Sequence, residues 1–321
     1  MPKVFLRDLT DGYHPAIGDA MAFLGDAANL RPGLRVAIKP NLTFPVYRPG
    51  VMTSIEAIEA LLRHLRDHGC QVTICEADSG GYNRFSMDQV FLATGLCELA
   101  ARYGARLVNL SNQDSREIQV RAGWRGLSVP LPRLLIDETD LLITMPVPKV
   151  HANTVVSGAI KNQWGVIQDP ARRLKLHPYF ARVIHALHQA LPRTIVVMDG
   201  RHGLDRNGPM RGDATQLNWL LASDSVFHAD RVMTSLIGID WRSVPHLRFF
   251  ARREPAAAFG RIEFNTDWRP FHRANFRLER RWTDAPGWCT FHSRSLAWLG
   301  YESPLAAPMH RLLYCFREPF Y

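Results

Sequence analysis

The sequence has few lysines, no Cys-x-x-Cys pair and no long apolar run, and these shortages limit the kinds of site and of protein that the chain can form. Five of the 39 basic residues are lysines, and the other 34 are arginines. The five cysteines are scattered without a Cys-x-x-Cys pair, which argues against a zinc ribbon and against an intrinsic iron–sulfur cluster. No apolar run approaches the ~20 residues that span a bilayer, so we predict no membrane partner.

The remaining composition is that of an ordinary globular protein, with 46% hydrophobic and 21% charged residues. The amino terminus, MPKVFLRDLTDG, lacks an apolar signal-peptide core. We therefore expect a cytoplasmic protein whose cysteines are free thiols. No dinucleotide-binding or phosphate-loop motif occurs, so no nucleotide cofactor is predicted.

The chain is basic, with a net charge of +9, and a basic chain favours an anionic partner. The last part, residues 241–321, holds 13 arginines against seven acidic residues, a net +6. Three of the five lysines (Lys39, Lys149 and Lys161) lie at predicted strand ends or on a helix predicted over 154–168. Because a buried lysine can lose its proton and an arginine does not, we interpret these lysines as functional.

Alternating apolar segments predict an α/β domain with a mostly parallel central sheet over residues 1–240. The apolar runs at 34–38, 71–76, 105–110, 141–145 and 194–198 are the expected strands, and a helix capped by Ser54 follows the first of them. A second helix is expected over 87–103, a hairpin over 112–132 and a turn-rich loop over 203–212. Residues 241–321 form an Arg/aromatic-rich extension that packs on the core or on a partner subunit, so a homodimer is one predicted assembly.

The stretch 141–177 organises the predicted site. A buried strand ends at Pro146, and Lys149 and His151 follow it. We predict a helix over 154–168, which places Ser157, Lys161 and Gly165 on one face. Open α/β sheets bind ligands at the carboxyl ends of their strands, so this stretch is the predicted binding site.

Polar residues also follow the other predicted strands, and the carboxyl ends of parallel strands meet at one edge of a sheet. We therefore expect these side chains to converge on a small anionic substrate: Lys39, Asn41, Glu76, Asp78, Ser79, Lys149, His151 and Asp199. The segment Asp78-Ser79-Gly80-Gly81 resembles a weak anion-binding nest.

Three further interpretations remain open at this point. Ser157 and Lys161 have the spacing of a nucleophile pair on a helix. The side chains of His151 and His177, with Glu76, Asp78 or Asp199, are a candidate set of ligands for a divalent metal. The basic extension, with four tryptophans among six arginines over 268–298, has the composition of a nucleic-acid-binding segment.

Several motifs together resemble the DUF362 family over roughly residues 34–235. They are IKPNL at 38–42, Lys-x-His at 149–151, SGAIKNxxG at 157–165, His177, and Asp-Gly…Gly-Pro…Gly at 199–212. The resemblance implies that the family positions are Lys39, Asn41, Lys149, His151, Ser157, Gly158, Lys161, Asn162, Gly165, His177, Asp199, Gly200, Gly208, Pro209 and Gly212. Many members carry or neighbour iron–sulfur modules, which implies redox chemistry for some of them, whereas this chain lacks the cysteine motif.

The sequence thus predicts a cytoplasmic enzyme that acts on a small anionic molecule, a carboxylate above all, by Lys/His acid–base chemistry. Lys149, His151, Lys161 and Asp199 are the predicted catalytic residues. The predicted substrate-binding residues are Lys39, Asn41, Asp78, Ser79, Ser157, Asn162 and His177. Isomerase-type proton transfer and redox chemistry both remain open, and the alternative is a nucleic-acid-binding or other non-catalytic module.

Overall fold

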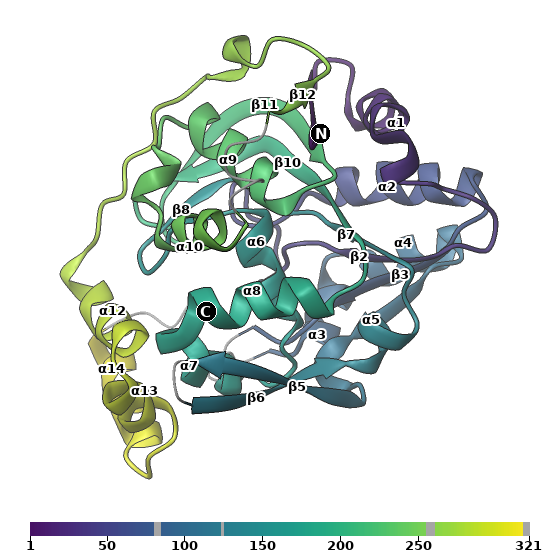
Figure 1. Ribbon diagram of the computed structural model, residues 1–321. Helices are drawn as coiled ribbons and strands as arrows, with labels where there is room; N and C mark the ends of the chain where they lie inside the picture. Colours follow the sequence, from purple (N-terminus) through teal and green to yellow (C-terminus); the bar gives the residue numbers. More distant parts are fainter. Residues whose placement is uncertain (80–84, 123–124, 255–260, 317–321) are drawn as a thin grey trace.

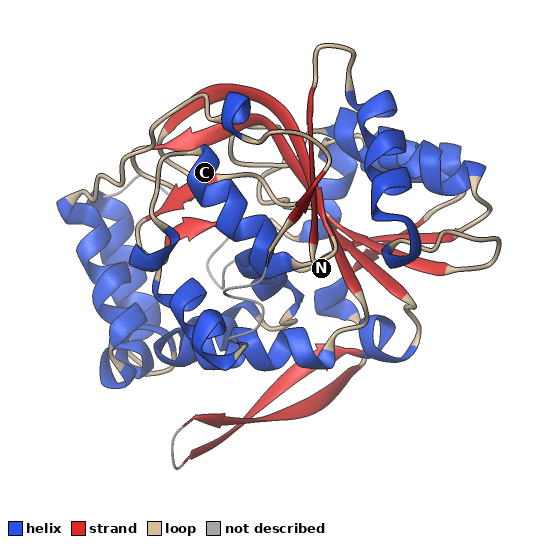
Figure 2. Ribbon diagram, turned by 45° about the horizontal axis from the view of Figure 1, so that its top comes forward, coloured by secondary structure: helices blue, strands red, loops and turns tan. Residues whose placement is uncertain are grey.

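A computed structural model describes residues 1–79, 85–122, 125–254 and 261–316. These residues form a twisted ten-stranded sheet with helices on both faces (Figure 1), and a separate two-stranded hairpin projects from the body (Figure 2). The predicted α/β class, with a mostly parallel central sheet flanked by helices, is confirmed. Gly80 and Gly81 of the predicted anion-binding nest lie outside the described residues.

The large sheet has the spatial order β12-β1-β11-β10-β7-β2-β3-β4, with β8 paired to β10 and β9 paired to β8. Its strands are β1 (Lys3–Asp8), β2 (Arg35–Lys39), β3 (Gln71–Glu76), β4 (Arg106–Asn109), β7 (Leu141–Thr144), β8 (Lys149–His151), β9 (Val155–Ser157), β10 (Thr194–Asp205), β11 (Asp213–Ser223) and β12 (Glu263–Phe264). The separate hairpin consists of β5 (Ser115–Ala122) and β6 (Arg125–Pro132), as the sequence predicts.

The helices cover both faces of this sheet. They are α1 (Tyr13–Leu24), α2 (Ile55–Asp67), α3 (Met87–Ala93), α4 (Leu96–Tyr103), α5 (Arg133–Asp137), α6 (Ala159–Asn162), α7 (Pro170–Leu176), α8 (Phe180–Ala190), α9 (Val226–Leu236), α10 (Pro245–Arg253), α12 (Ala285–His292), α13 (Arg294–Tyr301) and α14 (Ala306–Phe316). The predicted Ser54 cap is confirmed, because its Oγ accepts a hydrogen bond from the Ala57 N–H at 3.3 Å.

Strand alternation divides the apolar residues between two cores. In β2, Val36 and Ile38 enter the core beneath α1 and α2, whereas Ala37 enters the core beneath α8 and α9. In β10, Val197 enters the core beneath α1 and α2, and Val196 enters the core beneath α8 and α9. Because successive side chains of a strand point to opposite faces, a continuous apolar run is the signature of a strand that is covered on both sides.

Two elements differ from the prediction because of backbone geometry. The helix expected over 87–103 is two helices, α3 and α4, since Gly95 adopts a φ of +77° between them. The strand expected over 194–198 continues to Asp205 and forms a long antiparallel hairpin with β11. The first residues of the expected loop over 203–212 therefore belong to β10.

The predicted helix over 154–168 is wrong at its start, and within this range only α6 and a 3-10 helix over Gln163–Val166 are helical. Lys149 pairs with Ser157 across the short β8–β9 hairpin, and helix α6 begins only at Ala159. Val155 has a φ of +69°, which no helix contains. Ser157 and Lys161 therefore do not share a helical face, and the helical spacing that suggested a nucleophile pair does not exist.

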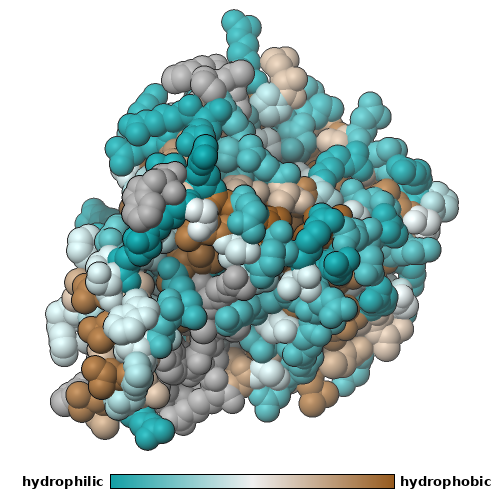
Figure 3. All heavy atoms as spheres, turned by 60° about the horizontal axis from the view of Figure 1, so that its bottom comes forward, coloured by the Kyte–Doolittle hydropathy of each residue, from teal (hydrophilic) through white to brown (hydrophobic). Residues whose placement is uncertain are grey.

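The part of residues 241–316 that the structure describes packs on the core at several places. Strand β12 pairs with β1, and the side chains of Phe276 and Phe291 are buried in the core beneath α8 and α9. Helices α13 and α14 expose apolar side chains, among them Leu296, Trp298 and Leu312, and Figure 3 shows hydrophobic side chains at this edge of the molecule. A domain boundary at residue 240 stays a prediction.

Candidate functional site

A cavity of about 360 Å³ opens at the carboxyl ends of β2 and β3. The β8–β9 hairpin, α6, α7, the turn between β10 and β11, and the start of α12 provide its other walls. We call it the central cavity. The predicted site residues that line it are Lys39, Asn41, Ser79, Lys149, His151, Ser157, Lys161, Asn162 and His177.

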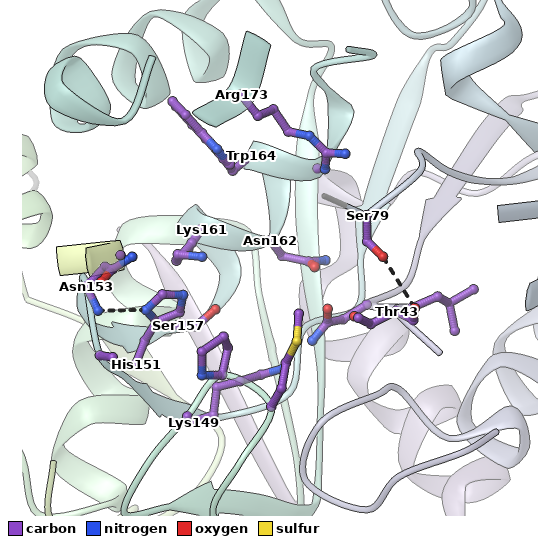
Figure 4. A pocket seen from close by; sticks show the side chains of 18 of the residues that line it. Thr43, Ser79, Lys149, His151, Asn153, Ser157, Lys161, Asn162, Trp164 and Arg173 are labelled. Carbon is purple, nitrogen blue, oxygen red and sulfur yellow. Dashed lines mark hydrogen bonds between the residues drawn. The ribbon is translucent and has the colours of Figure 1, made fainter. Parts of the chain in front are cut away.

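The close view of the cavity shows how these side chains are grouped (Figure 4). Lys149, His151, Ser157 and Lys161 lie together, with Trp164 and Arg173 above them in the view. Ser79 and Thr43 lie on the other side, where the Ser79 hydroxyl donates to the Thr43 carbonyl at 3.3 Å.

Asp78 and Asp199 do not line the central cavity. The Asp78 carboxylate accepts from the Met87 N–H at 2.6 Å and from the Asn109 amide at 3.1 Å, so it fixes the start of α3. Asp199 lies within β10 rather than after it, which reverses the expectation that it stands at a strand end. The predicted roles of both aspartates at the site therefore have no support in their positions.

The Asp199 carboxylate is fully engaged elsewhere. It accepts from the Tyr13 hydroxyl, from the Ser54 N–H at 2.8 Å and from the Arg201 N–H at 3.1 Å. These contacts tie β10 to the start of α2, on the opposite side of the sheet from α6. Asp199 is therefore placed to stabilise the fold.

The strand ends that form the cavity floor are held by buried polar contacts. The Lys39 ammonium lies 2.7 Å from the Glu76 carboxylate and also donates to the Pro40 carbonyl at 3.0 Å. The Asn162 amide donates to the Lys39 carbonyl at 3.2 Å and to the Thr144 hydroxyl at 2.8 Å. The Asn41 amide donates to the Val51 carbonyl at 3.0 Å. These contacts set the positions of β2, β7 and α6 around the cavity.

Two lysines of the cavity have lowered pKa values. Burial, together with the charges of Lys161 and Lys39, lowers the pKa of Lys149 to about 7. Burial and the charge of Arg173 lower the pKa of Lys161 to about 8. Near neutral pH, Lys149 is therefore often a neutral amine while Lys161 is mostly an ammonium ion.

The imidazole of His151 is neutral and has a defined tautomer. Its Nδ1 accepts a hydrogen bond from the Asn153 N–H at 3.0 Å, so the ring proton lies on Nε2. Burial and the neighbouring charge of Lys161 lower the pKa of His151 well below its ordinary value. The ring therefore offers an uncharged N–H donor beside the two lysines.

Arg173 and Trp164 line the cavity but were missed by the sequence analysis. The Nη2 of Arg173 and the Nε1 of Trp164 are buried and lack a hydrogen-bond partner among the described residues. The Trp164 ring stacks on His177, with centroids 5.7 Å apart, and burial lowers the pKa of His177 to about 3. Arg173 stands four residues before His177, and this one-turn spacing is the signal that could have identified it.

The carboxyl-terminal part of the chain closes one side of the cavity. Asp284 and Gly287 line it, and the Asn207 amide holds Asp284 in place with a hydrogen bond of 2.6 Å. The sequence analysis assigned no residue of 241–321 to this site. The contact is decided by tertiary packing between α12 and the turn that follows β10.

The structure also bears on the two other interpretations. No group of three His, Cys, Asp or Glu side chains in the described ranges is arranged to hold a metal ion. Several arginines of the proposed nucleic-acid segment already have protein partners: Arg269 pairs with Asp267, Arg273 pairs with Asp8, and Arg280 donates to the Ala152 carbonyl. In the part of the chain that the structure describes, no helix has the length and hydropathy of a membrane span.

The chain matches one family model, is similar in sequence to a known protein, and is distantly similar in structure to solved proteins. The chain is 25% identical over 237 residues to a thylakoid-associated protein of Synechocystis sp., covering 69% of each chain. The apoprotein of lactate racemase from Thermoanaerobacterium thermosaccharolyticum is 13% identical, with a TM-score of 0.42, and the match covers 72% of this chain and 56% of that one.

A structural-genomics protein from Thermotoga maritima is 10% identical, with a TM-score of 0.40, and the match covers 68% of this chain and 57% of that one. The chain thus spans little more than half the length of the solved structures that it matches. The model of the family described as a domain of unknown function, DUF362, matches residues 36–235. The chain therefore belongs to the DUF362 family.

Proposed function

We propose that this protein is an enzyme that binds a small organic carboxylate in the central cavity and transfers a proton at the carbon beside the carboxyl group. The observation that carries the proposal is the set of unsatisfied or cationic donors on one cavity wall. The Nη2 of Arg173 and the Nε1 of Trp164 are buried and have no hydrogen-bond partner among the residues that the structure describes, and both line the cavity with Lys149 and Lys161. A buried donor without a partner costs about 1–3 kcal/mol, and an anionic ligand removes that cost.

The acid–base assignment follows from the two pKa values. Lys149, with a pKa of about 7, is the base in its neutral form, and Lys161, with a pKa of about 8, is the acid in its charged form. A general base works best when its pKa lies near the pH at which the enzyme operates. Between about pH 7 and pH 8 both lysines hold the required protonation states.

The proposed step balances within the cavity. The Lys149 amine takes the proton from the carbon, and the electron pair moves onto the oxygens of the carboxyl or neighbouring carbonyl group. The His151 Nε2–H and the Arg173 guanidinium stabilise the resulting enolate through hydrogen bonds. The Lys161 ammonium then returns a proton to carbon, which inverts a centre or moves a double bond.

Isomerase-type chemistry is thus the reaction that the geometry supports best. Redox chemistry, which the sequence left open, stays a prediction. The cytoplasmic location stays a prediction from composition. The nucleic-acid-binding alternative is less favoured because several of the arginines that it needs are already paired within the protein.

The experiment that tests the proposal is exchange of substrate hydrogen in heavy water. A panel of short carboxylates that carry a hydrogen on the carbon beside the carboxyl group, 2-hydroxycarboxylates among them, is incubated with the purified protein, and loss of the signal of that carbon-bound proton is followed by proton NMR. We expect exchange with at least one acid, and we expect Lys149→Met to reduce its rate by about a hundredfold or more.

A lysine outside the cavity provides the matched control. Lys175 lies 3.7 Å from Glu302 at the surface, so Lys175→Met should leave the exchange rate unchanged. Native mass spectrometry of the purified protein should detect a bound acid that is lost in Arg173→Met. A protein that exchanges no acid, binds none, and carries nucleic acid instead would overturn the proposal.

A further inference from the structure

A second cavity of about 320 Å³ adjoins the central cavity. His177 and Asn153 line both cavities, so they mark the place where the two meet. We call the second cavity the ring pocket. Its walls come from the segment that follows α7, from α8, from α10 and from the end of α12 (Figure 1).

Aromatic side chains form most of the ring pocket. Phe180 lies against Phe291, with centroids 5.7 Å apart, and meets the His246 ring edge-on at 5.6 Å. Tyr179 and Phe249 complete the lining. Rings in these edge-to-face and tilted arrangements favour a further ring as their ligand, because the edge of one ring is attracted to the face of the next.

Two polar atoms of this lining have no partner. The Nε2 of His246 and the hydroxyl of Tyr179 are buried and make no hydrogen bond within the described residues. His246 is only 1% exposed, so water outside the molecule does not satisfy it. Buried polar groups in native proteins are nearly always hydrogen-bonded, so two polar atoms without a partner in the lining of one pocket indicate a polar ligand or an internal water.

The charges around the ring pocket favour a neutral ring. Burial lowers the pKa values of His177 and His246 to about 3, so both imidazoles are uncharged at neutral pH. Arg182 lies over the Phe249 ring at 5.9 Å, at the edge of the pocket. The cationic groups for an acid therefore lie in the central cavity, and the aromatic lining lies next to it.

We propose that the ring pocket binds a neutral aromatic ring with a polar substituent, so that the substrate of the central cavity is an aryl-substituted organic acid. This inference rests on the proposed function for its acid group. It adds the substrate class: a carboxylate at Arg173 and Lys161, and a ring between Phe249 and Phe291 whose substituent pairs with His246 or Tyr179.

The test compares probes that carry the acid, the ring, or both. Isothermal titration of the full chain at about pH 7 uses propionate for the acid, p-cresol for the ring, and 4-hydroxyphenylacetate and 3-(4-hydroxyphenyl)propionate for the combination. We expect at least one aryl acid to bind about tenfold more tightly than propionate, since burying a ring removes apolar area from water.

The variants separate ring binding from acid binding. Phe249 is only partly buried, so Phe249→Ala should keep the fold, which circular dichroism checks. We expect this variant to lose most of the aryl preference and the binding of p-cresol while its affinity for propionate stays within about twofold. His246→Phe, which keeps a ring but removes the nitrogen, should weaken the hydroxylated probes more than their phenyl analogues.

The outcomes distinguish the two proposals. Binding of p-cresol that is lost in Phe249→Ala supports the ring pocket even when no acid binds, and in that case the proposed function fails alone. Aryl acids that bind no better than propionate, together with p-cresol that fails to bind, overturn the ring pocket and leave the proposed function standing. A preference that survives in both Phe249→Ala and His246→Phe also overturns it.

Discussion

Lys39 and Glu76 form a buried ion pair at the floor of the central cavity, with 2.7 Å between Nζ and Oε2 and side chains that are 1% and 4% exposed. The pair joins the carboxyl ends of β2 and β3. Gly165 packs directly on it, since a Cβ at that position would lie 2.9 Å from the Glu76 carboxylate. The ends of β2 and β3 and the segment at Gly165 are thus fixed around one pair of opposite charges.

Removing one partner of this pair should destabilise the protein strongly. Lys39→Met leaves the Glu76 carboxylate buried without a counter-charge, and we expect a loss of about 3–5 kcal/mol in the free energy of unfolding. Urea unfolding of the variant and of the unchanged protein measures this loss in the free energy of unfolding. The double variant Lys39→Met with Glu76→Gln should regain most of the loss, because neither charge of the pair remains. Equal losses in the single and double variants would contradict this account.

The lowered pKa of Lys149 makes stability depend on pH. Its pKa is about 7 in the folded protein and near 10.5 in the unfolded chain, so between these values the unfolded state binds the extra proton. The free energy of unfolding should therefore rise with pH across this window. Lys149→Met removes the effect, so its urea midpoint relative to the native protein should fall steadily from about pH 7 to about pH 10. A pH-independent difference would contradict the buried position, and Lys175→Met serves as the control.

Gly158 is required by its contact with helix α9. A Cβ at this position would lie 2.2 Å from the Asp230 carboxylate, which accepts from the N–H groups of Ala159 and Ile160 and so holds the start of α6. Gly158→Ala should lower the free energy of unfolding by about 1–3 kcal/mol. It should also weaken acid binding, because Lys161 moves with α6.

A second glycine provides the matched control for this steric argument. Gly18 lies inside α1, where an added Cβ meets nothing within 4 Å. Gly18→Ala should raise the free energy of unfolding by about 0.5–1 kcal/mol, because glycine is a poor helix former. Thermal and urea unfolding of the two variants would then move in opposite directions, and a shift in the same direction would refute the contact argument.

Asp199 should affect stability rather than ligand binding. Tyr13→Phe removes one donor to its buried carboxylate, and we expect a loss of about 1–3 kcal/mol in the free energy of unfolding. The affinity for the acids of the central cavity should stay unchanged within about twofold, because neither Tyr13 nor Asp199 lines that cavity. A selective loss of acid binding in a stable Tyr13→Phe protein would contradict this account and would indicate that Asp199 contributes to the binding site.

The local sequence was a good guide wherever a short-range signal decides the structure. The apolar runs of β2, β3 and β7 are covered on both faces, and Ser54 caps α2 through a hydrogen bond three residues away. The polar residues that follow β2 and β7 line one cavity because these parallel strands share an edge. These features depend on the residues of one element and on one general rule of sheet geometry.

The sequence misled where a distant contact decides the outcome. Residues 154–168 have a helical pattern, but pairing of Ser157 with Lys149 and the approach of Asp230 to Gly158 select a hairpin followed by a short helix. Asp199 follows an apolar run, yet pairing with β11 extends the strand beyond it. Asp230 comes from α9, far away in the sequence, and each hairpin depends on pairing with the next strand along the chain, so the pattern within a single element contains neither kind of contact.

The sequence by itself determined the α/β class, the family and the set of scarce lysines that meet at the strand ends. Only the tertiary structure decided that Arg173, Trp164 and the start of α12 join them, that Asp78 and Asp199 do not, and that an aromatic pocket lies next to the cavity. The physical reason is that the apolar periodicity of a strand or helix lies within a short stretch of sequence, whereas burial, lowered pKa values and unpaired donors arise only when distant segments exclude water together.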